Sequence, residues 1–196
     1  MSRPQMQVSQ ARGRTAHGDL ATLGLVAIGA ALLLVRTWLP TLGSFGRLAG
    51  LIATLLAILA ASLLVPAARS ITHLHPGVVL AVGLVAVALA LASGGRPVPA
   101  PLVAWALPLT LLAAVAEEAL FRRTMYGALE RRGAIVAIGA TALAFALVHV
   151  PIYGVAVFPV DLGAGLLLSW QRWACGSWTV PAGTHAAANV LMTVLR

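Results

Sequence analysis

The sequence predicts an all-α fold, a polytopic integral membrane helical bundle of about seven transmembrane helices. Two features of its composition support this prediction. Of its 196 residues, 60% are hydrophobic and only 9% are charged, and the mean hydropathy is +0.96. Soluble domains carry about 25% charged residues, so this composition is typical of helices that face lipid. The third feature is that apolar runs long enough to cross a bilayer alternate with short polar segments.

The apolar runs divide the chain into a polar beginning and seven expected spans. Residues 1–19 are polar and have no apolar periodicity, so we expect a short disordered cytoplasmic arm. Residues 20–196 are expected to form a single transmembrane helical domain. The expected spans are 20–39, 48–65, 76–92, 101–132, 134–150, 159–170 and 180–195.

The basic residues point to a membrane topology rather than to a nucleic-acid partner. All 13 cationic residues are arginines, and the formal net charge is +8. A nucleic-acid-binding protein gathers such charge on one solvated face, whereas these arginines lie between apolar runs. Cytoplasmic loops are enriched in arginine. With the N-terminus inside, nine arginines, including Arg122, Arg123 and Arg172, fall on the cytoplasmic side and four on the other. The N-terminus is therefore predicted to be cytoplasmic.

The segment VAEEALFRR, residues 115–123, places two adjacent glutamates in the fourth expected span. An acid in hydrocarbon costs about 2.5 to 3.5 kcal/mol on insertion scales, so it needs a partner, a hydrated cavity or a function. Arg122 follows Glu118 by four residues and is its expected partner on one helix face. Glu117 lies about 100° around the helix and needs another neighbour. Alternatively, the whole cluster is a helix end solvated among lipid headgroups.

Two histidines in apolar segments are candidate neighbours. His149 follows Phe145 by four residues in FALVHV, and His185 precedes Asn189 by four residues in THAAANV. A single histidine within a membrane helix is often a packing residue with a hydrogen bond. Two histidines together with a glutamate in apolar sequence favour a polar site inside the bundle.

Helix geometry predicts that one histidine meets the glutamate pair. Gly133 follows two arginines, as residues at a helix end often do. Glu117 lies 16 residues before Gly133 and His149 lies 16 residues after it. If the fourth and fifth spans form an antiparallel hairpin, both side chains lie about 24 Å from the turn, because an α-helix rises about 1.5 Å per residue. A continuous helix over 101–132 would be about 48 Å long, so Arg122 would be buried while Arg131 and Arg132 are solvated.

Three short motifs on separate hydrophobic segments resemble those of the CPBP family of intramembrane proteases, which includes the type II CAAX prenyl endopeptidases. The resemblance covers residues 117–189, and residues 1–100 match only as generic spans. It implies a CAAX prenyl endopeptidase-like catalytic core within 101–196, in a multi-pass protein of the bacterial cytoplasmic membrane. The motif residues are Glu117, Glu118 and Arg122 in EExxxR, Phe145 and His149 in FxxxH, and His185 and Asn189 in HxxxN.

The resemblance implies hydrolysis of a peptide bond inside the membrane. Glu117 would be the general base that activates a water molecule, and His149 would help to hold that water. His185 and Asn189 would stabilise the oxyanion of the tetrahedral intermediate. The supporting residues would be the Glu118 and Arg122 pair and Phe145, which packs or faces the substrate.

A metal-dependent mechanism is the alternative. Glu117, His149 and His185 could hold zinc in the manner of metalloproteases. However, the HExxH pattern is absent, the two histidines come from different helices, and the amide of Asn189 is a poor zinc ligand. We therefore favour a glutamate-type mechanism without a metal or other cofactor.

Two other functions are compatible with the same residues. The glutamate and histidines could form the proton path of a membrane transporter or proton-relay protein, or the chain could be a noncatalytic bacteriocin-immunity-type membrane factor. A protease would act on a membrane-embedded or lipid-anchored protein, near a C-terminal processing or sorting signal. The sequence does not distinguish a prenylated CAAX tail from a transmembrane sorting helix or a bacteriocin-related peptide.

Overall fold

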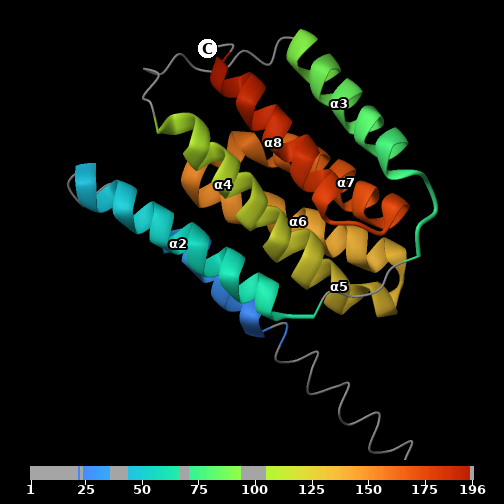
Figure 1. The fold of residues 1–196 in the computed structure, drawn as a ribbon, viewed down its shortest axis with the longest axis horizontal. Coiled ribbons are helices and arrows are strands. Elements are labelled where there is room, and N and C mark those ends of the chain that lie inside the picture. Colours follow the sequence, from blue (N-terminus) through green and yellow to red (C-terminus); the bar gives the residue numbers. More distant parts are fainter. Residues whose placement is uncertain (1–21, 23, 36–43, 67–70, 94–104, 195–196) are drawn as a thin grey trace, which may run out of the picture.

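Every regular element in the described part of the chain is helical. The computed structural model describes residues 22, 24–35, 44–66, 71–93 and 105–194 (Figure 1). Seven helical rods occupy these residues, which confirms the expected all-α fold for this part. The predicted arm over residues 1–19 lies outside the described residues.

The first three rods are α-helices of apolar sequence. They are Gly24–Val35, α2 over Ser44–Leu64 and α3 over Pro76–Ala92. The bounds of α3 agree with the expected span, because a proline at its first position and a capping side chain mark its beginning. The ring Nδ1 of His75 accepts the backbone N–H of Gly77 at 3.2 Å. Helix α2 begins four residues before the expected span.

The fourth rod is not the continuous α-helix predicted over 101–132. Residues 101–104 lie outside the described part, and the rest forms α4 (Ala106–Glu118), the π-helix η2 (Ala119–Met125), α5 (Tyr126–Leu129) and the 3₁₀-helix η3 (Glu130–Arg132). In the π-helix, the Thr124 hydroxyl donates to the carbonyl of Ala119, five residues earlier, at 3.0 Å. The wider π turn buries consecutive side chains, Leu120, Phe121 and Arg122 among them.

Three further rods complete the bundle. They are α6 (Ala134–Tyr153), α7 (Phe158–Cys175) and α8 (Thr179–Val194), and the short 3₁₀-helix η4 (Val155–Val157) joins α6 to α7. Gly133 at φ 106° and Gly154 at φ 89° bound α6, and this left-handed backbone suits glycine. Helix α8 begins one residue before the expected span and runs through Pro181 and Gly183 without a break.

Helix α7 continues past its expected end at Trp170. The polar Gln171 and Arg172 suggested a loop, but both side chains are buried. Gln171 Nε2 donates to the carbonyl of Val79 and to Thr184 Oγ1, each at 2.9 Å, which ties α7 to α3 and α8. Arg172 Nε donates to the carbonyl of Arg122 at 3.1 Å. Arg172 therefore lies buried in a helix, beyond the expected end of this span at residue 170.

The rods pack side by side, with α2 and α3 on opposite flanks of the bundle (Figure 1). Helix α4 packs against α2 and α8, α8 also contacts α3 and α7, and α6 packs closely against α7. The main hydrophobic core joins the first rod, α2, the fourth rod and α6. Its buried members include Leu33, Leu55, Ile58, Phe121, Phe145 and Val148.

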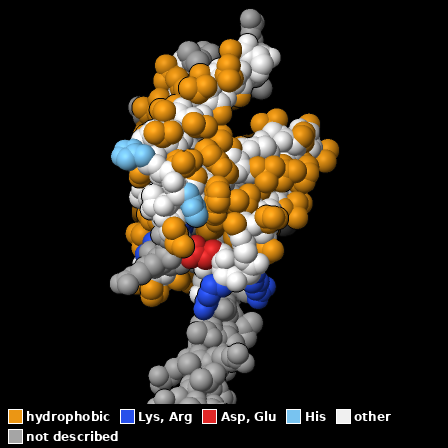
Figure 2. All heavy atoms as spheres, turned by 90° about the vertical axis from the view of Figure 1, so that its right-hand side faces the viewer, with side chains coloured by type: hydrophobic (Ala, Val, Ile, Leu, Met, Phe, Trp, Pro, Cys, Tyr) orange, Lys and Arg blue, Asp and Glu red, His pale blue; other side chains and the backbone are white. Residues whose placement is uncertain are grey.

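The outer surface is largely apolar. Hydrophobic side chains cover most of the face in Figure 2, while arginine side chains gather at one end. Within the described residues, Phe45–Leu64 and Ala134–Tyr153 are long and apolar enough to cross a membrane, and Gly24–Val35 and Pro76–Ala92 are shorter apolar helices. Many large apolar side chains on these helices are exposed, among them Ile135 at 88% and Leu64 at 85%. Such a surface suits a lipid environment.

Candidate active site

The second glutamate of the EExxxR motif forms a buried ion pair. Arg122 Nη1 donates to Glu118 Oε1 at 3.0 Å, and both side chains are fully buried. The other terminal nitrogen of the guanidinium, Nη2, donates to the carbonyl of Gly165 on α7 at 3.2 Å. The guanidinium also lies 4.6 Å from the centroid of the Phe145 ring. This burial contradicts the alternative in which the cluster is solvated among lipid headgroups.

The other arginines of the fourth rod have different surroundings from Arg122. Arg131 and Arg132 are exposed, as expected for a solvated helix end. Arg123 is partly buried and donates to backbone carbonyls at the end of α2, Ser62 among them. Of the nine arginines assigned to the cytoplasmic side, Arg122, Arg123 and Arg172 therefore make internal contacts. The arginine count favours a cytoplasmic N-terminus less strongly than the sequence suggested.

Glu117 lies between the two histidines. Its Oε2 atom is 3.7 Å from His149 Nε2 and 4.0 Å from His185 Nε2. All three side chains are largely buried, with 4% of the Glu117 side chain exposed. The hairpin of the fourth rod and α6 thus brings Glu117 and His149 to one level, as their equal spacing from Gly133 predicts. Helix α8 places His185 at the same depth.

The ring hydrogen bonds orient both imidazoles. His149 Nδ1 lies 2.7 Å from the carbonyl of Phe145, and a carbonyl only accepts, so this nitrogen carries a proton. His185 Nδ1 lies 3.0 Å from Glu118 Oε1 and donates to that carboxylate. Both Nε2 atoms therefore face Glu117, where each can accept a hydrogen bond or, when its ring is doubly protonated, donate one.

Asn189 and Phe145 complete the motif residues. Asn189 Nδ2 donates to the carbonyl of Thr110 on α4 at 3.1 Å, which uses one of its two amide hydrogens. The Phe145 ring lies 4.6 Å from the ring of His149 and 5.8 Å from that of His185, measured between centroids. Phe145 therefore packs against both imidazoles and limits how far either ring can turn.

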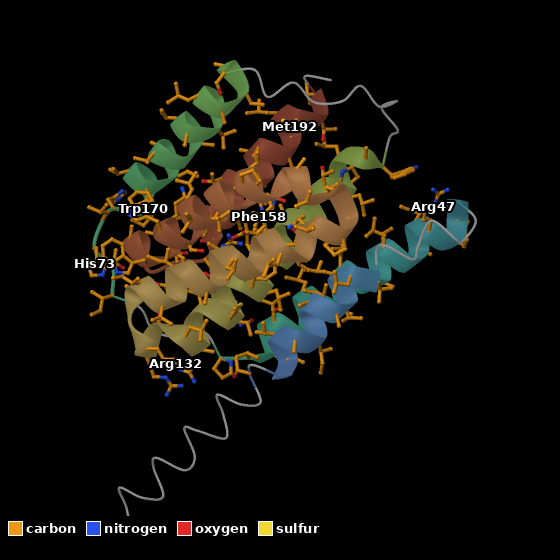
Figure 3. The ribbon with its side chains drawn as sticks, turned by 180° about the vertical axis from the view of Figure 1, so that it is seen from behind. Arg47, His73, Arg132, Phe158, Trp170 and Met192 are labelled. Atoms are coloured by element: carbon orange, nitrogen blue, oxygen red, sulfur yellow. The ribbon has the colours of Figure 1, made fainter. Side chains whose placement is uncertain are left out.

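These side chains border a pocket of about 370 Å³. It lies between α4, α6, η4, the beginning of α7 and α8, and most of its wall is apolar. Met192, which lines it, and Arg132 lie at opposite ends of the molecule in Figure 3. The pocket therefore extends from Glu117 away from the arginine-rich end. Its lining residues are Thr110, Ala113, Glu117, Phe145, His149, Tyr153, Val157, Asp161, His185, Asn189, Met192 and Thr193.

Asp161 also lines this pocket, although it belongs to none of the three sequence motifs. It is one of only five acidic residues in the chain and lies 12 residues after His149. Its Oδ2 atom is 3.9 Å from His149 Nδ1, and its side chain is 18% exposed. An acid in an apolar helix was the available signal, because such a residue needs a partner or a function.

A water molecule fits between Glu117 and either histidine. Zinc holds nitrogen and oxygen ligands at about 2.0–2.2 Å, so neighbouring ligands of a tetrahedral ion lie about 3.4 Å apart. The gaps from Glu117 Oε2 to His149 and His185 are wider, at 3.7 Å and 4.0 Å. A water about 2.8 Å from both atoms spans either gap. Among the described residues, no three His, Cys, Asp or Glu side chains are grouped to hold a metal ion.

The comparison with protein families agrees with the three motifs. Residues 99–191 match the model of the family described as Type II CAAX prenyl endopeptidase Rce1-like. These residues are an Rce1-like domain. The matched segment contains all seven motif residues, from Glu117 to Asn189, so the resemblance drawn from the sequence is confirmed. Comparisons with curated proteins and with solved structures gave no match.

The match to the Rce1-like family bears on the function of the polar cluster. Its family name describes endopeptidases, so membership favours peptide hydrolysis over the transporter and noncatalytic alternatives. The same membership, together with the two membrane-length apolar helices, favours an integral membrane protein. The domain begins before α4 and ends within α8, so it includes every residue that lines the pocket except Met192 and Thr193.

Proposed function

We propose that the chain is an intramembrane endopeptidase that hydrolyses a peptide bond of a membrane-embedded or lipid-anchored protein, near a C-terminal processing or sorting signal. The observation that supports this best is the position of the Glu117 carboxylate between the Nε2 atoms of His149 and His185, beside a pocket in an apolar bundle. The Rce1-like domain supports the reaction class.

In this proposal all seven rods cross the membrane, and the end that carries Arg131 and Arg132 faces the cytoplasm. A bilayer core is about 30 Å thick. Glu117 lies 16 residues before Gly133, or about 24 Å along the rod. The site is then inside the bilayer, and its pocket extends towards the outer leaflet. Burial inside the bundle keeps its charged groups away from lipid, where they would be costly.

The reaction begins with a water molecule held by Glu117 Oε2 and His149 Nε2. Glu117 takes a proton from this water as the general base, and the water oxygen attacks the carbonyl carbon of the scissile peptide bond. The new carbon–oxygen bond forms while the π electrons of the carbonyl move to its oxygen. The geometry supports this step because the two atoms that would hold the water are 3.7 Å apart.

His185 and Asn189 stabilise the resulting oxyanion. Glu118 accepts the Nδ1 proton of His185 at 3.0 Å, and its negative charge favours a doubly protonated ring. Nε2 of that ring then donates to the oxyanion, and Asn189 offers the amide hydrogen that Thr110 does not use. Donors shielded from water act strongly on developing charge. Arg122 holds Glu118 in place from the opposite side.

The tetrahedral intermediate collapses when Glu117 returns its proton to the leaving nitrogen. The carbon–nitrogen bond breaks, and the products are a carboxylic acid and an amine. Glu117 thus acts as base and then as acid, and the cycle consumes one water. No metal is needed for the proton transfers in this scheme, although zinc remains the alternative cofactor that a direct assay can test.

Substitution of Glu117 tests the proposal. Purified wild-type protein and Glu117→Gln are reconstituted in liposomes with membrane proteins extracted from cells that lack the chain, and protein C-termini are compared by mass spectrometry. We expect new C-termini with the wild type, formed about 10²- to 10⁴-fold more slowly by the variant, the usual contribution of a general base. Arg132→Gln is the control, because Arg132 is exposed at the end of the same rod, outside the pocket. Identical C-termini with wild type and Glu117→Gln would reject hydrolysis.

A further inference from the structure

A second pocket, of about 320 Å³, lies at the arginine-rich end of the bundle. Its wall is formed by the segment before α3, the end of the fourth rod, the beginning of α6 and the end of α7. It shares no lining residue with the pocket beside Glu117. His73, which lines it, and Arg132, which follows its lining residue Arg131, lie toward the same end of the molecule in Figure 3. A pocket of this volume is large enough for a small ligand or a headgroup.

Backbone hydrogen bonds hold the wall of this second pocket in place. The backbone N–H groups of His73 and Leu74 both donate to the carbonyl of Ala174 near the end of α7, at 2.9 Å and 2.8 Å. The ring of His73 packs against that of Trp173, with centroids 4.6 Å apart. The segment before α3 is thus fixed to α7, so the pocket is formed before any ligand binds.

Three side chains that line the pocket carry N–H donors. Arg131 and His73 are exposed, and Trp173 is half-buried. Within the described residues, the rings of His73 and Trp173 contact each other but make no hydrogen bond. A guanidinium has five N–H groups, so Arg131 can donate to a ligand in addition to its contacts within the chain. An oxyanion is the ligand group that accepts from all three side chains.

The charges around the pocket are unequal. Among the lining residues of the described structure, Glu130 is the only acid, and its Oε2 atom lies 3.7 Å from Nη2 of the buried Arg172. The Arg172 guanidinium lies 5.1 Å from the centroid of the Tyr126 ring, which lines the pocket. Its Nη1 atom is buried and makes no hydrogen bond in the described structure. Arg131 and Arg172 thus accompany one glutamate, and this surplus of positive charge favours an anionic ligand.

Large apolar side chains adjoin these charged groups. Ile71 lines the pocket and is 76% exposed, and Ile135, which follows the lining residue Ala134, is 88% exposed. Figure 2 shows charged side chains of both signs together at one end of an otherwise apolar face. A ligand with an anionic head and apolar chains matches both parts of this surface. A free phosphate compound would leave the apolar side chains without a partner.

We propose that the second pocket binds the phosphate of an anionic phospholipid, with the acyl chains along Ile71 and Ile135. This inference uses the membrane placement proposed above and is independent of hydrolysis. In that placement the pocket lies at the cytoplasmic surface of the bilayer, where tryptophan is enriched and where basic pockets between helices bind phospholipid headgroups. Arg131, His73 and Trp173 donate to the phosphate oxygens. The surplus positive charge selects a lipid with net negative charge over a zwitterionic one.

Lipid binding is measured by native mass spectrometry of the purified full chain in detergent. The protein is titrated with phosphatidylglycerol or with phosphatidylcholine of the same acyl chains. We expect phosphatidylglycerol to bind about fivefold more tightly, and Arg131→Gln to raise its Kd about fivefold, the usual effect of one basic side chain near an anionic headgroup. Arg132→Gln is the matched control, because it removes the same charge from an exposed neighbour outside the pocket. Its Kd should stay within about twofold of the wild type.

Two results of this titration would overturn the inference. Equal Kd values for the two lipids would show that the pocket does not select an anionic headgroup. Equal weakening by Arg131→Gln and Arg132→Gln would show only a general attraction of the arginine-rich end for negative charge.

Trp173→Phe tests the donors separately from the net charge. The change keeps an aromatic ring against His73 and removes the indole N–H. We expect the Kd for phosphatidylglycerol to rise about threefold to tenfold, as for the loss of a hydrogen bond to a charged group. Melting temperatures without lipid show which variants are folded, and Trp173→Phe decides the question if Arg131→Gln does not fold. An unchanged Kd for a folded Trp173→Phe would reject this position for the phosphate.

Two further measurements identify the source of the phosphate and separate this inference from the proposed function. Glycerol 3-phosphate lacks acyl chains, so we expect it to bind much more weakly than phosphatidylglycerol, and equal Kd values would reject a lipid ligand. Glu117→Gln should retain the preference for phosphatidylglycerol, because Glu117 lies outside this pocket. If the wild type cleaves nothing but binds phosphatidylglycerol through Arg131, hydrolysis is rejected and this inference stands. If it cleaves but binds both lipids alike, the reverse holds.

Discussion

His185 and Glu118 are joined by a hydrogen bond of 3.0 Å between Nδ1 and Oε1, and Arg122 donates to the same oxygen at the same distance. One carboxylate oxygen therefore holds both a histidine that faces the pocket and an arginine that is completely buried. The EExxxR motif is thus linked to the HxxxN motif through a single atom. The other carboxylate oxygen, Oε2, is buried without a hydrogen bond in the described structure.

The first prediction is that Glu118→Gln destabilises the protein strongly. The change leaves the shape of the side chain nearly intact but removes the charge that compensates the fully buried Arg122. Removing one partner of a buried ion pair typically costs about 3 to 5 kcal/mol. We expect a lower melting temperature of the purified protein in detergent, followed by intrinsic tryptophan fluorescence.

A double variant provides the control for this charge effect. Replacing both partners, in Glu118→Gln with Arg122→Gln, removes the unpaired charge, so we expect part of the lost stability to return. Equal melting temperatures for the wild type and Glu118→Gln would show that the pair does not stabilise the fold.

The second prediction concerns the close contact between α6 and α7. A Cβ added at Gly165 would lie 2.9 Å from the Cα of Ala142 and 3.0 Å from its carbonyl oxygen. Backbone atoms on both sides cannot move aside cheaply, and Gly165 also accepts a hydrogen bond from Arg122. We expect Gly165→Ala to lower the free energy of unfolding by about 1 to 3 kcal/mol, the usual cost of overpacking. Reversible unfolding in detergent would measure this change.

Gly139→Ala is the matched control within α6. A Cβ at Gly139 meets nothing within 4 Å, so the substitution should be neutral or should stabilise the helix by up to about 1 kcal/mol. If both alanine variants unfold alike, the close approach of α6 and α7 at Gly165 does not limit stability.

Much of the site was predictable because helices convert sequence spacing into position. The interval of four residues between Glu118 and Arg122 predicts their ion pair, and the equal intervals from Gly133 predict that Glu117 meets His149. Both contacts are present, at 3.0 Å and 3.7 Å. The apolar runs likewise predict the rods, since runs of this length have few alternatives to helix.

The remaining features depend on contacts between rods, which spacing does not encode. Gln171 and Arg172 looked like a loop because both are polar, yet α3, α8 and the π-helix supply partners that bury them. The π-helix itself has no signal in the apolar pattern of ALFRRTM. Asp161 lies near His149 because α7 packs against α6. The sequence around Asp161 does not indicate that His149 is its neighbour.

The third prediction distinguishes the glutamate-type mechanism from a zinc mechanism. We expect the proteolytic activity in liposomes to be unchanged within about twofold after dialysis against a strong chelator, and the purified protein to contain far less than one zinc per chain by elemental analysis. The reason is the spacing of 3.7 Å and 4.0 Å between Glu117 Oε2 and the two Nε2 atoms, which is wide for a tetrahedral ion. Activity lost on chelation and restored by zinc alone would establish the metal alternative.

The fourth prediction tests membrane orientation with single cysteines at two exposed arginines. Arg47 lies near the beginning of α2 and Arg132 at the end of the fourth rod, at separate places on the molecule (Figure 3). The end of α2 contacts Arg123 in the fourth rod, so Arg47 lies at the end of α2 away from that contact. If the arginine-rich end is cytoplasmic, a membrane-impermeant maleimide should label Arg47→Cys in intact cells and label Arg132→Cys only after lysis.

The native Cys175 is buried, so the wild type should give little background in this labelling experiment. The reverse pattern would place the N-terminus outside, and labelling of both from outside would show that α2 does not cross the bilayer.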